Sequence, residues 1–180
     1  MATFAIDIDE HHWLANTDPE QDLCSHGRVF VRVDGQPVVS PDDGELTLSA
    51  AALYLLRTLE QDHSPEHRIG EHLLPCCGNT LIAPGDGSTD VVILGCPNGI
   101  DWSVAHEGES VRLHDLHGHP PLDPARTMNA TISIEQYRKA VGEFASAVWS
   151  LFDGSPKRIA DSEDRRGYAA FSEEFQRRLI

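Results

Sequence analysis

Alternation of apolar and polar residues predicts strands in the first forty positions of the chain. Residues 4–8 repeat with period two, the pattern of a strand that buries one face. The segment "RVFVRVDGQPVV" alternates in the same way and turns at Asp34-Gly35, where left-handed backbone costs little. Pro37 has no amide proton to donate to a sheet, so the returning arm is expected to be an edge strand. The N-terminal region is therefore predicted to be a strand followed by a hairpin.

Apolar residues at helical spacing predict three helices. The first covers residues 50–61, with Ser49 as its cap and a regular apolar stripe as its core face. The second begins at Ser133, which forms a capping box with Gln136 and precedes a long apolar stripe. The third runs over residues 168–179, with acidic residues ahead of basic ones as the helix dipole prefers.

The middle of the chain is predicted to form a three-stranded antiparallel meander. Continuous apolarity at residues 91–94 indicates a strand covered on both faces. Asn98-Gly99 is a strong hairpin signal, which predicts that the next strand folds back on the first. That next strand alternates, and its pattern places Asp101 and Ser103 on the solvent side.

These elements predict an α+β fold made of one domain over residues 1–180. In this fold, an antiparallel meander sheet of roughly five to seven strands packs against one mid-chain helix and two C-terminal helices. The segment 115–129 is rich in Pro, Gly and His without periodicity, so it is expected to be a surface loop within that domain. The first ten residues lack a basic and an apolar region, and the longest apolar run is short. A soluble, cytoplasmic protein is expected.

The charge of the chain disfavours nucleic acid and membrane surfaces as partners. The formal net charge is −15, and residues 157–180 hold six basic against five acidic residues, so the part before them carries −16. Such a field repels phosphate and attracts a basic protein, although acidity also serves solubility alone. The residues expected to form an acidic docking face with its aromatic anchor are Asp7, Asp9, Trp13, Asp101, Ser103 and Glu107.

The cysteines and histidines suggest a metal site as an alternative. Four irregularly spaced cysteines indicate free thiols in a reducing compartment, either as ligands of zinc or as small core residues. The residues expected to ligate a metal are Cys76, Cys77, Cys96, His106, His117 and His119. The sequence contains no HExxH, CxxC, GxSxG or phosphate-loop motif, so no catalytic residue is assigned.

The segments "LLPCCGNTLI", "GCPNGIDWSVAHEGESVRL" and "ISIEQYRKAVGEFASAVWSLF" resemble those of small acidic bacterial proteins of unassigned activity. In general character the chain is also similar to the immunity proteins of polymorphic toxins. That resemblance implies a non-enzymatic protein, monomer or homodimer, that occludes the active site of a basic partner. The alternatives are a metal-binding protein or metal-dependent enzyme, and a structural homo-oligomer that buries an apolar sheet edge.

Overall fold

The computed structural model describes residues 1–78, 80–85 and 88–179 and has the predicted α+β class. The elements follow in the order β1 (Phe4–His12), β2 (His26–Val33), β3 (Gln36–Val39), η1 (Pro41–Asp43), β4 (Leu46–Thr47), α1 (Leu48–Arg57), β5 (Leu74–Pro75), β6 (Thr80–Ile82), β7 (Val92–Leu94), β8 (Gly99–Glu107), β9 (Ser110–His119), β10 (Asn129–Ser133), α2 (Ile134–Asp153) and α3 (Ser162–Leu179).

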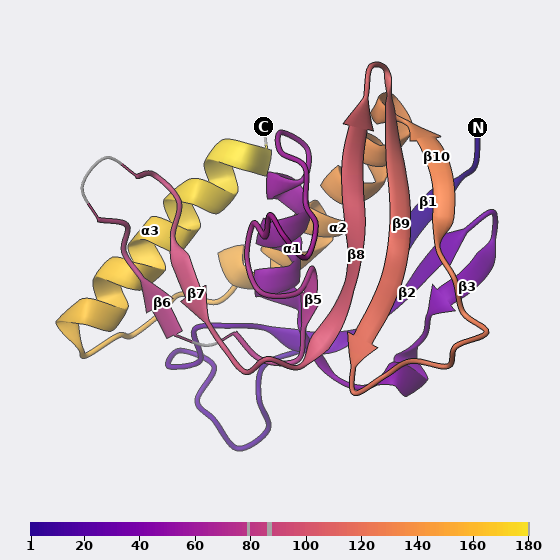
Figure 1. Ribbon diagram of the computed structural model, residues 1–180. Helices are drawn as coiled ribbons and strands as arrows, with labels where there is room; N and C mark the ends of the chain where they lie inside the picture. Colours follow the sequence, from indigo (N-terminus) through magenta and orange to yellow (C-terminus); the bar gives the residue numbers. More distant parts are fainter. Residues whose placement is uncertain (79, 86–87, 180) are drawn as a thin grey trace.

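The described strands form two four-stranded antiparallel sheets and one two-stranded hairpin. The first sheet has the order β1-β2-β3, with β4 also paired to β2, and the second has the order β10-β9-β8-β5. The Ala2 amide, just before β1, donates to the Thr131 carbonyl on β10 at 3.0 Å, which links the start of the first sheet to the second (Figure 1). The predicted first strand and the β2–β3 hairpin are confirmed. The prediction of a single sheet of five to seven strands was wrong, because the described strands are divided among two four-stranded sheets and a hairpin. Strands of two or three residues leave no periodic signal.

Helix α1 is the centre of the fold, between the β8–β9 side and the α3 side of the molecule (Figure 1). All ten of its residues are buried, which explains why it is apolar or small around almost its whole circumference. The helix begins two residues earlier than predicted, with Thr47 as its N-cap, and ends at Arg57 rather than at residue 61. The Ser49 hydroxyl instead accepts a hydrogen bond from the Ser25 amide at 3.1 Å, which ties the helix to the start of β2.

Arg57, at the last turn of α1, carries a charge into this core. Its guanidinium donates to both carboxylate oxygens of Glu174 on α3, at 2.8 and 2.9 Å, and to the carbonyls of Ile69 and Val91. Glu174 also accepts from Arg178 at 2.9 Å. The buried charges are therefore paired and hydrogen-bonded, which is the condition for charges to remain inside a core.

The two C-terminal helices pack on the sheets and on α1. Helix α2 begins as predicted, because the Ser133 hydroxyl accepts from the Gln136 amide at 3.2 Å. Its apolar stripe contacts α1, β1 and β10. Helix α3 starts six residues earlier than predicted and joins α2 through an aromatic group that includes Trp149 and Phe175, whose ring centroids are 4.9 Å apart.

The predicted central meander is confirmed for the antiparallel pairing of β8 with β9 but was wrong for its first strand. Strand β7 pairs with β6, and the partner of β8 on that side is β5, with Leu74 opposite Ile100. Val92 and Leu94 are 49% and 48% exposed, so β7 is not covered on both faces. The hairpin lies on α3 by one face only, and the alternating burial of its residues follows from that contact.

The predicted loop at residues 115–129 was also partly wrong, since β9 continues to His119. The β8–β9 register shifts between Asp101 and Ser103, and Asp115 has φ of 57°. This bulge hides the period-two pattern that would have indicated a strand.

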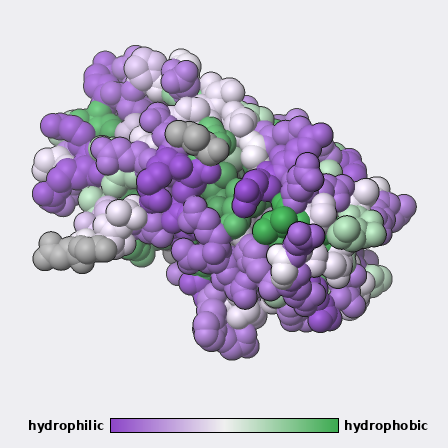
Figure 2. Space-filling view, turned by 90° about the horizontal axis from the view of Figure 1, so that it is seen from above, coloured by the Kyte–Doolittle hydropathy of each residue, from purple (hydrophilic) through white to green (hydrophobic). Residues whose placement is uncertain are grey.

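The buried apolar side chains form one cluster that takes residues from both sheets and all three helices. From above, the surface is mostly hydrophilic, with a few hydrophobic side chains in its middle (Figure 2). In the described part of the chain, no helix combines the length and the apolar character that crossing a membrane requires.

Candidate metal centre

The segment that joins β1 to β2 is held in place by one buried carboxylate. Asp22 accepts from the Leu14 amide at 2.9 Å and from the Cys24 amide at 3.3 Å. The second bond is a local turn of the kind that Asp forms with the amide two residues on. The chain then enters β2 at His26, which pairs with His12 at the end of β1. These bonds bring Asp22, Cys24 and His26, each two residues apart, to the same side of the chain.

The three side chains present their donor atoms to one point. A carboxylate oxygen of Asp22, the sulfur of Cys24 and a ring nitrogen of His26 all lie within 4.8 Å of one another. Cys24 Sγ is 3.5 Å from His26 Nε2 and 3.7 Å from Asp22 Oδ1, and Asp22 Oδ2 is 3.9 Å from the same nitrogen. Two ligands bound 2.0–2.3 Å from one tetrahedral ion are separated by roughly 3.4–3.6 Å. The observed spacing therefore fits three ligands of one ion with small adjustments.

The geometry does not fit a nucleophilic triad. In such a triad the histidine uses one ring nitrogen for the nucleophile and the other for the carboxylate, whereas Cys24 and Asp22 both approach Nε2 of His26. Burial, followed by the nearby Asp22 carboxylate, raises the pKa of the Cys24 thiol to about 12. An activated cysteine needs the opposite shift. The arrangement is suited to coordination.

The protonation state of His26 suits the same role. Burial is the largest cause that lowers its pKa, so the ring is neutral at physiological pH and able to ligate. His12 faces it across the strand pair, with ring centroids 6.4 Å apart. The Nδ1 atom of His12 is buried and has no hydrogen-bond partner in the described structure, while its Nε2 is 3.6 Å from Glu45. His12 therefore neighbours the three donors, although it is not part of the group whose donor atoms all lie within 4.8 Å of one another.

A cation lies on the other side of the cluster. The Lys157 ammonium sits 3.2 Å from the centroid of the Trp13 ring and donates to the Pro19 carbonyl at 2.7 Å. Burial lowers its pKa to about 8, against the opposing influence of Asp22. The Trp13 indole also donates to Ser155 at 3.2 Å. The segment after α2 thus covers the joining segment and limits the access of solvent to Cys24.

The acidic docking face predicted from the sequence is not assembled. Asp101 and Ser103 are 0% and 2% exposed, so the prediction that they face solvent was wrong. Asp101 is buried because its Oδ1 accepts from the Leu73 amide at 3.0 Å and lies 2.9 Å from His63 Nε2. These partners come from the segment between α1 and β5, which covers the face of β8 that alternation had assigned to water.

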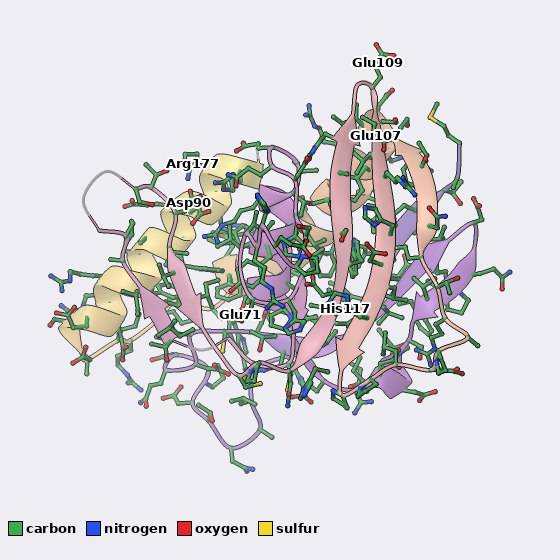
Figure 3. The ribbon with its side chains drawn as sticks, viewed as in Figure 1. Glu71, Asp90, Glu107, Glu109, His117 and Arg177 are labelled. Carbon is green, nitrogen blue, oxygen red and sulfur yellow. The ribbon has the colours of Figure 1, made fainter. Side chains whose placement is uncertain are left out.

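The other residues of that predicted face lie apart. Asp7 and Asp9 are exposed on β1, where Asp7 pairs with Arg32. Glu107 is exposed at the tip of the β8–β9 hairpin in the other sheet (Figure 3). Trp13 is half-buried, with its ring centroid 5.0 Å from that of Phe152, and is part of the packing around Lys157.

The six residues predicted to ligate a metal are divided among four places. Three of them are the thiols Cys76, Cys77 and Cys96, which lie together where β5 meets β8. The histidines have separate partners: His106 contacts Asp62 at 2.7 Å, His117 is 3.8 Å from Asp101, and His119 contacts Asn98 at 2.6 Å.

Among the described residues, the group of three converging donors is Asp22, Cys24 and His26, none of which was predicted. The spacing Asp-x-Cys-x-His was the sequence signal that could have indicated this group, because side chains two residues apart in an extended chain point to the same side.

No protein-family model, no curated protein and no solved structure matches this chain. Its function is therefore argued from the chemistry of its own side chains.

Proposed function

We propose that this protein binds a divalent transition-metal ion, zinc in the first place, through Asp22, Cys24 and His26. The observation that carries the proposal is the convergence of three buried donors of different chemistry within 4.8 Å. Sulfur, imidazole nitrogen and carboxylate oxygen together are a ligand set that zinc accepts. Magnesium and calcium prefer oxygen alone, and copper(I) prefers sulfur, so the mixed set favours zinc over them.

The role that fits this position is structural. Structural zinc sites use four protein ligands, and His12 would supply the fourth by turning its ring toward the three, because its buried Nδ1 has no other partner in the described structure. The bound ion would then join the end of β1, the joining segment and the start of β2 at one point. Since these ligands do not converge in an unfolded chain, the ion is expected to raise the stability of the folded protein.

The test is cobalt substitution of protein purified without a histidine tag. Cobalt(II) in a tetrahedral site with a thiolate ligand gives intense visible absorption and a sulfur-to-metal charge-transfer band. We expect one equivalent of cobalt to produce both signals, and one equivalent of zinc to abolish them and raise the melting temperature.

Matched cysteine variants locate the site. Cys24→Ser is expected to remove the charge-transfer band, whereas Cys96→Ser keeps it, because Cys96 belongs to the thiol group at β5 and β8. The reverse result would move the metal to that group and contradict the proposal. Absence of stoichiometric binding by both metals would also contradict it. His12→Ala is expected to weaken zinc binding by roughly 10- to 100-fold, and an unchanged affinity would exclude His12 as a ligand.

A further inference from the structure

Two segments far apart in sequence are pressed together beside β5 and β8. The Cys76 amide donates to the Asn98 carbonyl at 3.0 Å, which continues the pairing of β5 with β8. A Cβ atom at Gly95 would lie 2.0 Å from the Cys77 carbonyl oxygen, so the two backbones touch and the position accepts only glycine. This contact fixes Cys96, the next residue, against the adjacent pair Cys76 and Cys77.

A hydrogen bond joins two of the three cysteines. The Cys96 amide donates to the Cys77 sulfur at 2.9 Å. Hydrogen bonding to the Cys77 thiol is the largest influence that lowers the pKa of Cys96, with further contributions from the Asn98 amide and the Cys76 thiol. Burial raises the pKa of Cys76 and of Cys77. A negative charge in this group therefore belongs on Cys96, where three donors stabilise it.

The group is also accessible. Cys76 is exposed, and Cys77 and Cys96 are intermediate in exposure, in contrast to the buried Cys24. Cys76 lines an open pocket of about 370 Å³ that also includes Glu45 and His119. A small molecule can thus reach the thiols without opening the core.

We propose that Cys96 and Cys77 form a thiol–disulfide exchange site that accepts electrophilic sulfur from small disulfides such as glutathione disulfide. The Cys96 thiolate attacks one sulfur of the disulfide, forms a mixed disulfide and releases one small thiolate. The Cys77 sulfur then attacks the Cys96 sulfur, forms the Cys77–Cys96 disulfide and releases the second small thiolate. In total the two cysteines lose two protons and two electrons, and the small disulfide is reduced to two thiols.

The resulting bond would enclose the β6–β7 hairpin. This hairpin lies between Cys77 and Cys96 in the sequence and contacts α3, where a Cβ at Gly167 would lie 1.8 Å from the Leu81 carbonyl oxygen. Oxidation would tie both ends of the hairpin segment together and restrict its detachment from α3. Cys76, hydrogen-bonded to the same sulfur, is placed to serve as a second resolving thiol.

The experiment follows the intact mass of the native full-length chain in a chelator-containing buffer with glutathione disulfide. The wild type is expected to lose two hydrogen atoms, with Cys77 and Cys96 joined in the peptide map. The double variant Cys76→Ser/Cys77→Ser is expected to stop at a glutathione adduct on Cys96. The variant Cys96→Ser is expected to react at least about tenfold more slowly, because it lacks the stabilised thiolate.

The control is Ser146→Ala, at an exposed position of α2 outside both proposed sites, which should behave as the wild type. Circular dichroism verifies that each variant is folded, and the adduct on Cys96 in the double variant tests the site even if Cys96→Ser does not fold. A wild type that forms no Cys77–Cys96 bond, or an adduct spread equally over the exposed thiols, would overturn the proposal. In a parallel reaction without chelator, one equivalent of zinc should leave the reaction unchanged. Protection by zinc would place the metal on these thiols and contradict the proposed zinc centre instead.

Discussion

Zinc affinity is expected to rise steeply with pH, with a slope set by Cys24. The thiol must lose its proton to ligate zinc. In the metal-free protein, burial and then the Asp22 carboxylate raise the pKa of this thiol to about 12. The thiol is therefore protonated at every pH at which the protein would be handled, and zinc binding must expel one proton.

The expulsion of one proton fixes the magnitude. The apparent affinity should increase tenfold per pH unit, about 1.4 kcal/mol, and about 100-fold over two units. His26 adds no second proton at neutral pH, because burial lowers its pKa. Lys157, whose pKa burial lowers to about 8, loses its charge as the pH rises through that value. A bound ion would repel the charged ammonium and favour loss of its proton, so the slope should steepen slightly as the pH approaches 8 from below and return to one proton above it.

The assay is competition against a chromophoric zinc chelator of known pH dependence, with proton release followed in weak buffer. Cys24→Ser should remove the slope, and Cys96→Ser should keep it. A wild-type affinity that does not change with pH, or the same slope in Cys24→Ser, would show that the buried thiol is not a ligand and would refute the reasoning.

Three further predictions concern stability in urea titrations. Glu174→Gln leaves the buried Arg57 charge poorly paired and should lower the free energy of unfolding by about 3–5 kcal/mol. The exposed control Glu173→Gln should change it little, and equal effects of the two variants would contradict a buried ion pair. Ser133→Ala removes the α2 cap and should cost about 1 kcal/mol, so an unchanged midpoint would argue against the cap. Burial lowers the pKa of His72 from 6.5, so the unfolded chain binds more protons just below that pH and stability should fall there as the pH decreases. His72→Gln should make this loss of stability at low pH smaller. A variant with the same dependence of stability on pH as the wild type would contradict the prediction.

Local signals were sufficient where neighbours in sequence are also neighbours in space. The β2–β3 hairpin depends on the turn at Asp34-Gly35, and both residues have positive φ, as the turn chemistry demands. The start of α2 depends on Ser133 and the amide three residues ahead. In both cases the determining contacts lie within a few residues, and the sequence pattern contains them.

Sequence patterns gave wrong predictions where a segment distant in sequence determines the burial of a side chain or the pairing of a strand. Asp101 alternates with apolar residues, which indicates an exposed side chain, but His63 and the Leu73 amide cover it. The strand at Val92 was paired with the wrong neighbour, because β5 is only two residues long and gives no warning that it occupies the edge of β8. The partner of such a strand depends on the tertiary structure, and the periodicity along one strand does not indicate which partner it has.

The cysteines of the two proposed sites differ in their exposure, and this difference explains how the two sites can coexist. Cys24 is buried, so oxidants have little access to its sulfur whether or not zinc has displaced its proton. Cys96 is accessible and surrounded by hydrogen-bond donors, which favour its thiolate. An oxidant should therefore react at Cys96 and leave the zinc ligand intact. Zinc should then leave the protein during oxidation only when the segment that joins β1 to β2 unfolds. We therefore expect the rate of zinc release in the presence of oxidant to equal the rate of zinc transfer to a chelator in its absence.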